Sequence, residues 1–247
     1  MSDMLAVRQL HAGYGEGDIL KGVDVTLPAG QVVTIIGPNG SGKSTLLKTL
    51  AGLLPVRQGD IVLKGQSLKD LSAPRRVRAG LSYVPQEYNV FRNLTVLENL
   101  KIAREFMADA KTRGAAVISD ELLELFPDLR GKFKARAGNL SGGQRQMLAL
   151  ACALAVRPEV LMLDEPSTGL SPKYMADIFE TVRTVNARGV SVLMVEQNAI
   201  EALRISNTCV VMANGRVRMT APADEVLGMK DLHSLYLGDA RENAVAI

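Results

Sequence analysis

Short runs of hydrophobic residues, separated by glycine and proline, open the chain and predict β-strands. The breaks between the runs are the glycine-rich segment 13–17 and the sequence Pro28-Ala29-Gly30. A second glycine-rich loop follows the third run, and residues 44–54 then have the leucine spacing of a helix. The predicted strands cover residues 5–10, 19–27 and 31–36. The chain is therefore expected to begin with a β-rich region whose last strand leads through a loop into a helix.

The hydrophobic pattern becomes mostly helical after about residue 87. The predicted helices cover residues 96–106 and 120–126, and a longer stretch that begins at Ser141 and ends before Pro158. We interpret residues 87–157 as a helical subdomain inserted into a core that is formed by residues 1–86 and 158–247. The whole chain, 1–247, is then a single domain with one insertion.

Beyond residue 158, two fully hydrophobic runs flank an amphipathic helix, and this alternation predicts a parallel sheet. The runs are residues 160–163 and 191–195, and the helix has one apolar stripe of Met175, Ile178, Phe179, Val182 and Val185. Asn214-Gly215 predicts a hairpin between residues 209–212 and 217–219, because this pair suits a turn with two positive φ angles. The tail is expected to end helically. The predicted fold class is α/β, with a parallel sheet core, an N-terminal antiparallel β subdomain and an inserted helical subdomain.

The composition is that of an ordinary globular protein, with 47% hydrophobic and 22% charged residues. The net charge of +3 comes from 29 basic and 26 acidic residues, which argues against a dedicated nucleic-acid-binding protein. The densest basic cluster, Arg75, Arg76 and Arg78, is expected to be the solvated face of a helix. Cys152 and Cys209 lie in apolar runs without metal-ligand or redox spacing, so we expect both to be buried, reduced thiols.

Two further patterns concern membranes. The first seven residues lack a basic segment followed by an apolar one, so we expect no secretory signal. The longest apolar run, residues 147–156, is too short to cross a bilayer and suits a buried helix. Any role at a membrane is therefore expected to depend on a partner protein.

The loop after the third predicted strand fits the pattern GxxxxGK[ST] of the phosphate-binding loop, or P-loop, and a helix follows it as that motif requires. Glycines let backbone N–H groups turn toward phosphates, and the start of the helix adds positive potential. Lys43 would reach the terminal phosphates and Ser44 would offer its hydroxyl to Mg²⁺. A plain glycine turn before a helix would not explain the lysine. The candidate nucleotide-binding residues of this loop are Gly37, Pro38, Asn39, Gly40, Ser41, Gly42, Lys43, Ser44 and Thr45.

A pair of carboxylates ends the predicted strand 160–163. Open α/β sheets bind their ligands at the carboxyl ends of strands, so Asp164 and Glu165 fit the second half of a nucleotide site. Asp164 would hold Mg²⁺ and Glu165 would polarise the attacking water, because phosphoryl transfer depends on positioning and charge neutralisation. An acidic pair at a strand end is usually structural, but the phosphate-binding loop upstream favours the catalytic interpretation.

A third motif opens the long predicted helix. It consists of Leu140, Ser141, Gly142, Gly143 and Gln144. Ser141 by itself would be explained as a helix cap. The two glycines and the glutamine leave exposed amides at a helix N-terminus, which is a second place where an anion can bind.

In this order and at about these spacings, the three motifs resemble those of the ATP-binding-cassette (ABC) ATPases, and the resemblance covers nearly the whole chain. It implies a P-loop NTPase-type fold, ATP and Mg²⁺ as ligands, and hydrolysis of ATP. It also implies a head-to-tail dimer in which the LSGGQ motif of one protomer closes over ATP on the other. Tyr14 matches the aromatic that stacks on adenine, although an exposed loop tyrosine is the alternative. Gln86 matches the glutamine that joins the subdomains and senses Mg²⁺ and the γ-phosphate, and the chain around it, through Phe91 and Leu94, would face the membrane subunits.

Two positions depart from the family pattern. Gln197 stands where a histidine usually contacts the γ-phosphate, and the only histidines, His11 and His233, match other regions. Glutamine can donate a hydrogen bond but cannot titrate. Our hypothesis is that Gln197 keeps this contact with slower or asymmetric hydrolysis, because the partner ATPase is a different chain that carries the histidine. Ser171 stands where the family often has aspartate. The contact that this aspartate usually makes across the dimer is therefore not expected to be the same here.

Three segments look like the smaller ATPase of branched-chain amino-acid importers. They are residues 195–198 (VEQN), residues 91–100 and Tyr236-Leu237-Gly238. This resemblance implies a peripheral subunit on the cytoplasmic face of the cell membrane. The implied partners are a second and different ABC ATPase, two integral-membrane permease subunits and, indirectly, a substrate-binding protein, without nucleic acid.

Three alternatives stay open at this point. Urea and amide importers share much of the pattern. A soluble ABC ATPase of translation or DNA repair would usually have tandem cassettes or coiled coils, and this chain has one cassette and no sustained heptads. A nucleotide-binding regulator that does not hydrolyse ATP is disfavoured by Glu165, the expected base.

Overall fold

The computed structural model describes residues 3–105 and 120–229 of the 247 residues. The predicted helical tail beyond residue 229 lies outside this range, as do His233 and the segment Tyr236-Leu237-Gly238. Within the described part of the chain, no helix combines the length and hydrophobicity needed to span a membrane.

The first of two sheets is antiparallel throughout and has the strand order β2-β1-β4-β5. Its strands are β1 (Asp3–Ala12), β2 (Leu20–Pro28), β4 (Gln58–Leu63) and β5 (Gln66–Ser67). Along β2, buried and exposed residues alternate, as expected for a strand with one face on the core. This sheet is the N-terminal antiparallel β subdomain that the sequence predicts.

The second sheet has six strands in the order β10-β9-β3-β8-β7-β6 and is parallel except for the hairpin at one edge. Its strands are β3 (Val32–Ile36), β6 (Leu81–Val84), β7 (Val160–Asp164), β8 (Ser191–Val195), β9 (Thr208–Ala213) and β10 (Arg216–Pro222). Every residue of β3, β7 and β8 is buried, which explains their continuous hydrophobic sequence. The predicted hairpin turn is confirmed, because Asn214 and Gly215 have φ angles of 52° and 77°.

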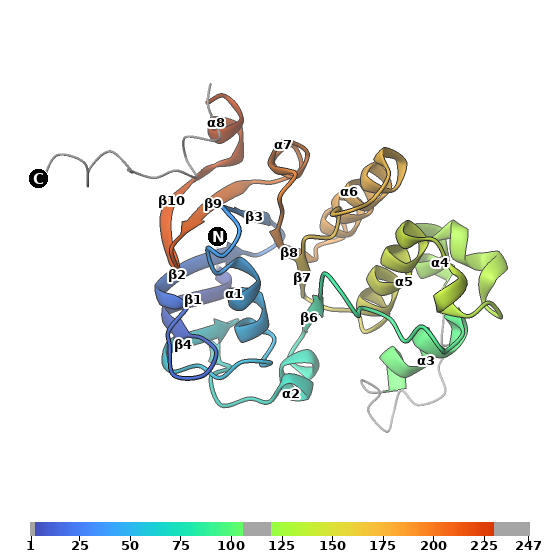
Figure 1. Cartoon of the computed structure of the whole chain (residues 1–247), viewed down its shortest axis with the longest axis horizontal. Helices are drawn as coiled ribbons and strands as arrows, with labels where there is room; N and C mark the ends of the chain where they lie inside the picture. Colours follow the sequence, from blue (N-terminus) through green and yellow to red (C-terminus); the bar gives the residue numbers. More distant parts are fainter. Residues whose placement is uncertain (1–2, 106–119, 230–247) are drawn as a thin grey trace, which may run out of the picture.

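Helix α1 (Lys43–Leu50) lies between the two sheets (Figure 1). Its buried Leu46, Leu47 and Leu50 share one core cluster with residues of both sheets, including Leu10 and Met162. The helix is shorter than the predicted 44–54 stretch, since Gly52 adopts a φ angle of 78° and ends it. Because α1 follows the loop after β3, its first residues lie at the carboxyl ends of the parallel strands.

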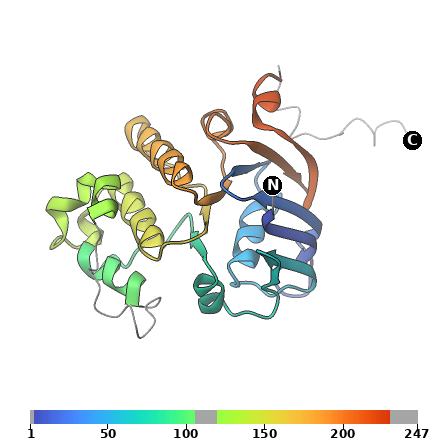
Figure 2. The same ribbon diagram turned by 180° about the vertical axis from the view of Figure 1, so that it is seen from behind.

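The remaining helices form two groups. The predicted helical region contains α3 (Val96–Glu105), α4 (Asp120–Leu125), the 3₁₀ turns Pro127–Lys132 and Ala137–Asn139, and α5 (Gly142–Ala155). Seen from behind in Figure 2, α3, α4 and α5 lie in green and yellow to one side of the sheets. Around the parallel sheet are α2 (Ala73–Arg78), α6 (Pro172–Ala187), α7 (Ala199–Leu203) and α8 (Ala223–Leu227). The α/β fold class with an inserted helical subdomain is confirmed, whereas the boundaries 87 and 157 stay a prediction.

One expectation about the surface is wrong. Arg75 and Arg78 are exposed as predicted, but the side chain of Arg76 is only 2% exposed. Its Nη1 donates to the carbonyl oxygens of Thr49 at 2.7 Å and Leu50 at 3.0 Å, the last residues of α1. Carbonyl groups at a helix C-terminus have no partner within the helix and carry partial negative charge. Arg76 is buried because it caps α1.

Both cysteines are free thiols, as expected. Cys209 is buried in β9, whereas Cys152 on α5 is only partly buried. Burial raises the pKa of each thiol to about 12.

Candidate functional site

The loop between β3 and α1 depends on glycine at particular positions. A Cβ atom on Gly37 would lie 2.1 Å from the carbonyl oxygen of Met212, so no other residue fits there. Gly42, the N-cap residue of α1, has a φ angle of 102°. Side chains rarely adopt such angles, and glycine does so without steric cost. The loop therefore returns to the N-terminus of α1 through backbone conformations that only glycine supplies readily.

Lys43, the first residue of α1, is buried within this loop. Its Nζ donates to the carbonyl oxygens of Gly37 at 2.9 Å and Pro38 at 3.1 Å. Burial lowers the pKa of Lys43, and the nearby carboxylates of Glu165 and Asp164 oppose this effect. A positive charge held inside a loop of backbone amides suits the terminal phosphates of a nucleotide.

A polar atom of the same loop lacks a partner. Ser41 Oγ is buried and has no hydrogen bond to any of the residues that the structure describes. Unsatisfied buried hydroxyl groups are rare in folded proteins and need an explanation, such as a ligand. The loop thus has unused capacity for a polar ligand, as a phosphate-binding loop should.

Ser44 and Asp164 meet in the way that the sequence predicts for a metal site. Ser44 Oγ donates to Asp164 Oδ1 at 2.8 Å, and Tyr83 Oη donates to Asp164 Oδ2 at 3.0 Å. Burial raises the pKa of Asp164, and these two hydrogen bonds oppose the shift. A hydroxyl and a carboxylate beside a phosphate-binding loop are the protein ligands that Mg²⁺ takes in such sites, so the donor set fits this ion. Tyr83 was not predicted from the sequence, because its position beside β7 follows only from the strand order.

Glu165 accepts three hydrogen bonds on one oxygen atom. Its Oε2 lies 2.7 Å from Gln197 Nε2, 2.9 Å from Gln86 Nε2 and 3.2 Å from Thr168 Oγ1. The residue has a φ angle of 49°, and its N–H donates to the carbonyl oxygen of Val195. The loops after β6, β7 and β8 thus bring together three residues that the sequence places in the site: Gln86, Glu165 and Gln197.

Gln197 also faces the phosphate-binding loop. Its Nε2 lies 3.5 Å from Asn39 Oδ1, so one side chain spans the space between that loop and Glu165. These residues line one cavity of about 370 Å³. Its walls are formed by Ile19, Asn39, Gly40, Gly42, Lys43, Ser44, Thr45, Gln86, Glu165 and Gln197. Gln197 therefore lines the same cavity as Lys43 and Glu165, and its contact with a γ-phosphate stays a prediction.

A third buried carboxylate, after Asp164 and Glu165, directly precedes Gln197 in the chain. Glu196 is 1% exposed and accepts hydrogen bonds from the N–H and the hydroxyl of Ser167, each at 2.9 Å. The N–H groups of Gln197 and Asn198 also donate to it, at 3.1 and 3.3 Å. Burial raises the pKa of Glu196, and these hydrogen bonds oppose that shift. Glu196 therefore ties the loop after Glu165 to the loop that holds Gln197, a role that the sequence analysis missed.

Tyr14 lies on the loop between β1 and β2 and is 51% exposed. Its hydroxyl accepts a hydrogen bond from Lys48 Nζ on α1 at 3.5 Å. This bond holds the tyrosine near α1, the helix that follows the phosphate-binding loop. An exposed aromatic ring at this place can accept the face of a base.

The signature segment, residues 140–144, lies at the start of α5 in the helical region. Ser141 and Gln144 form the expected capping box, in which each side chain bonds the backbone N–H of the other. Gly143 is required by packing, since a Cβ there would lie 2.2 Å from the ring of Tyr174. In the part of the chain that the structure describes, this segment does not line the cavity that holds Lys43 and Glu165. Within one chain, the two predicted anion sites are therefore separate.

The comparisons with known proteins agree with these motifs. The family model described as ABC transporter matches residues 20–168. A probable branched-chain amino acid transport ATP-binding protein of Archaeoglobus fulgidus is 42% identical over 236 residues, which cover 95% of this chain and 99% of that protein. A high-affinity branched-chain amino acid transport ATP-binding protein of Pseudomonas aeruginosa is 39% identical, covering 95% of this chain and 100% of its own.

More distant relatives serve other transporters. A lipopolysaccharide export system ATP-binding protein of Haemophilus influenzae is 31% identical and covers 96% of this chain and 98% of its own. A crystal structure of a nucleotide-free ATP-binding cassette from an ABC transporter superposes with a TM-score of 0.83 at 26% identity, over 96% of this chain and all of that one. This chain belongs to the ABC transporter family and is an ATP-binding, ATP-hydrolysing subunit of a transporter.

Proposed function

We propose that the chain hydrolyses ATP, with Mg²⁺, to drive a membrane importer for branched-chain, hydrophobic amino acids. The observation that carries the hydrolytic part is the convergence of Gln86 and Gln197 on Glu165, beside the loop that buries Lys43. The names of the two most similar relatives reported above support the solute.

In this proposal, residues that line the cavity act on ATP together with Asp164 and Tyr14, which are not among its lining residues. Lys43 and the amides of residues 37–45 bind the β- and γ-phosphates, where the positive charge attracts them. Ser44 and Asp164 would hold Mg²⁺ with the help of Gln86, and the ion would neutralise charge on the phosphates. Tyr14 would stack on adenine. The cavity by itself then orients the triphosphate without any covalent step.

Glu165 would accept the proton of the attacking water. Its Oε2 is held by three donors, so the carboxylate has a fixed direction before any water binds. Gln197 would donate to the γ-phosphate while its position next to Glu165 is kept. Because the glutamine cannot take up a proton, it contributes only a hydrogen bond at this place.

The signature segment would act on a second ATPase chain. Among the residues that the structure describes, this segment does not line the cavity of its own chain. It consists of Leu140, Ser141, Gly142, Gly143 and Gln144. A helix N-terminus with a glycine pair suits the γ-phosphate of an ATP molecule on a partner. We propose a head-to-tail dimer with a different ABC ATPase that carries the histidine missing here. Ser171, exposed at the N-cap of α6, stays without an assigned contact across the dimer.

The membrane partner would dock beside the loop that follows Gln86. There an apolar cavity of about 410 Å³ is lined by residues of both the sheet region and the helical region. Phe91, which lines it, is 61% exposed, and Tyr88 nearby in sequence is 90% exposed. Large exposed aromatic residues around an apolar groove suit a helix of a partner protein. We propose that the transporter has two permease subunits, and that a helix of one of them docks in this groove. The chain would then lie peripherally at the cytoplasmic face of the inner membrane. A substrate-binding protein would deliver the solute.

The experiment is affinity purification of the chain from membranes of its source cells in mild detergent with ATP and Mg²⁺. Recovery of two polytopic proteins and a second, histidine-bearing ABC ATPase is expected. Recovery of ribosomes or nucleic acid would contradict the transport function but not the ATPase activity. Uptake of labelled leucine, compared with urea, in cells with and without the gene then tests the solute.

A further inference from the structure

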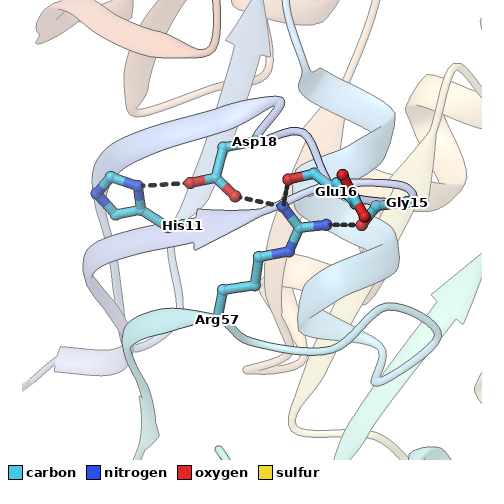
Figure 3. Close-up of polar contacts among 5 residues, drawn as sticks. All are labelled: His11, Gly15, Glu16, Asp18 and Arg57. Carbon is cyan, nitrogen blue, oxygen red and sulfur yellow. Dashed lines mark hydrogen bonds and ion pairs between the residues drawn. The ribbon is translucent and has the colours of Figure 1, made fainter.

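The loop that carries Tyr14, residues 13–18, is hydrogen-bonded by an arginine that lies elsewhere in the sequence. Arg57 precedes β4, and its guanidinium donates to the carbonyl oxygens of Gly15 and Glu16 and to Asp18 Oδ1 (Figure 3). The distances to Glu16 O and to Asp18 Oδ1 are 3.1 and 2.7 Å. One side chain thus contacts two residues of the loop's turn, Gly15 and Glu16, and Asp18, which follows it.

The loop is rich in glycine, and apart from Arg57 its tyrosine is contacted by Lys48 at 3.5 Å. Three of its residues are glycines, and a Cβ on Gly13 would lie 2.1 Å from the carbonyl oxygen of Gly17. Its base is closed by the hydrogen bond from Ile19 N–H to the carbonyl of Ala12, at 2.9 Å. Glycine-rich segments lose more conformational entropy on ordering than other segments, so their order depends on external contacts.

Arg57 is well placed to supply that contact. Its own N–H donates to the carbonyl oxygen of His11 on β1, at 2.9 Å, so its backbone is fixed to the neighbouring strand. Asp18, which it pairs with, also lies 3.2 Å from His11 Nδ1. Arg57, followed by His11, lowers the pKa of Asp18, so the carboxylate stays ionised at neutral pH. The three side chains form a connected polar group beside the Tyr14 loop, as Figure 3 shows.

We propose that Arg57 is a positioning residue that holds the loop 13–18 so that Tyr14 is presented to the adenine of ATP. The inference rests on the proposed function, in which Tyr14 stacks on that base. Arg57 does not itself touch the nucleotide in this proposal, because its donors are directed at the loop.

The planar guanidinium is essential to this role. Its fork of five N–H donors reaches two carbonyl oxygens and one carboxylate at the same time. A lysine offers a single ammonium point charge, which can pair with Asp18 but cannot span all three acceptors. Arg57→Lys should therefore keep the charge and lose most of the positioning.

The test compares two ligands that bind the same loop, ATP and inorganic tripolyphosphate, by calorimetry on the full chain. Tripolyphosphate has no base, so it reports the phosphate-binding loop alone. We expect Tyr14→Ala and Arg57→Ala each to weaken ATP binding about five-fold or more, which is the lower range for loss of one base stack. Binding of tripolyphosphate should stay unchanged. The double variant should bind ATP no more weakly than Tyr14→Ala, since both changes remove one interaction.

Arg57→Lys and Arg183→Ala complete the set. Arg183 is an exposed arginine whose partner is Glu180 on the same helix, so its loss should leave both affinities unchanged. Arg57→Lys, which keeps a positive charge opposite Asp18, should still weaken ATP binding. Full ATP affinity in both Arg57 variants, alongside loss in Tyr14→Ala, would overturn the inference alone. Equal weakening of tripolyphosphate and ATP in the Arg57 variants would also overturn it. Unchanged ATP affinity in Tyr14→Ala would instead overturn the proposed stacking, and the inference with it.

Discussion

Gln197 donates a hydrogen bond from Nε2 to Oε2 of Glu165 across 2.7 Å, joining the ends of strands β8 and β7. The resemblance to ABC ATPases predicts a histidine at this position. Because the glutamine amide has both donor and acceptor atoms, it can orient the carboxylate and still offer an N–H to a phosphate. In the proposed mechanism, glutamine would therefore keep the hydrogen bond to the γ-phosphate and remove the titration.

Replacing Gln197 with alanine should lower ATP turnover of the assembled transporter by about ten-fold or more, because one positioned donor is removed from the transition state. Gln197→His should retain turnover, since the ring also donates a hydrogen bond. Steady-state ATPase assays give both rates. Gln66→Ala, a change at an exposed residue of β5, is the control. The same turnover in the wild type and Gln197→Ala would refute the role of Gln197.

Replacing Glu165 with glutamine should reduce turnover at least 100-fold and leave ATP affinity within about two-fold of the wild type. The amide keeps the size of the side chain but cannot accept a proton from water. Phosphate release and equilibrium binding of ATP separate the two effects. Glu180→Gln, at an exposed position of α6, should change neither. Normal turnover in Glu165→Gln would exclude this residue as the base.

The stabilising effect of Glu196 should depend on pH with a defined sign. Burial raises the pKa of Glu196 above its usual value of 4.5, so between that pH and the raised pKa the folded chain binds more protons than the unfolded chain. Stability contributed by this group therefore falls as pH rises through the window. Glu196→Gln cannot titrate. The free energy of unfolding of the wild type minus that of Glu196→Gln should thus decrease from pH 5 to pH 7.5.

Urea unfolding of both proteins at several pH values measures this difference, in which the contributions of all other groups cancel. A difference that stays constant or grows with pH would show that the folded state does not retain the proton. Gln66→Ala, a change at an exposed residue of β5 that carries no titratable group, serves as the control and should give a flat difference.

Replacing Arg76 with alanine should destabilise the fold by about 2–4 kcal/mol, because buried carbonyl groups at the end of α1 would lose charged donors. Arg75→Ala is a matched control on the same helix, and its exposed side chain should change stability by less than about 0.5 kcal/mol. Urea unfolding gives both values. Equal, small effects of the two changes would show that Arg76 does not cap α1.

Local sequence was sufficient for the parts of the fold that depend on neighbouring residues. The spacing of Gly37, Gly42 and Lys43 predicts the phosphate-binding loop, because the whole motif lies within one short segment, although the close approach of Met212 to Gly37 is visible only in the tertiary structure. Asn214-Gly215 predicts the hairpin for the same reason. The Ser141 capping box is likewise contained within four residues. Such features need no knowledge of distant contacts.

The arrangement of the strands was beyond the sequence pattern. β3 follows β2 in the chain but lies at the centre of the parallel sheet, between β9 and β8. The short strands β4, β5 and β6 and the helix α7 were not predicted, since elements of this length carry too few residues to show a clear hydrophobic period. Arg76 was placed in solvent because its partners lie 26 and 27 residues earlier.

The same division holds for the site. By itself, the sequence predicted the residues for phosphate binding, for Mg²⁺ and for the attack by water, namely Lys43, Asp164 and Glu165. Only the tertiary structure decided that Tyr83 would bond Asp164, that Glu196 would join two loops, and that Arg57 would hold the loop of Tyr14. These contacts join residues between 29 and 81 positions apart. Which residues meet across such separations is set by strand order and sheet packing, and no local pattern records it.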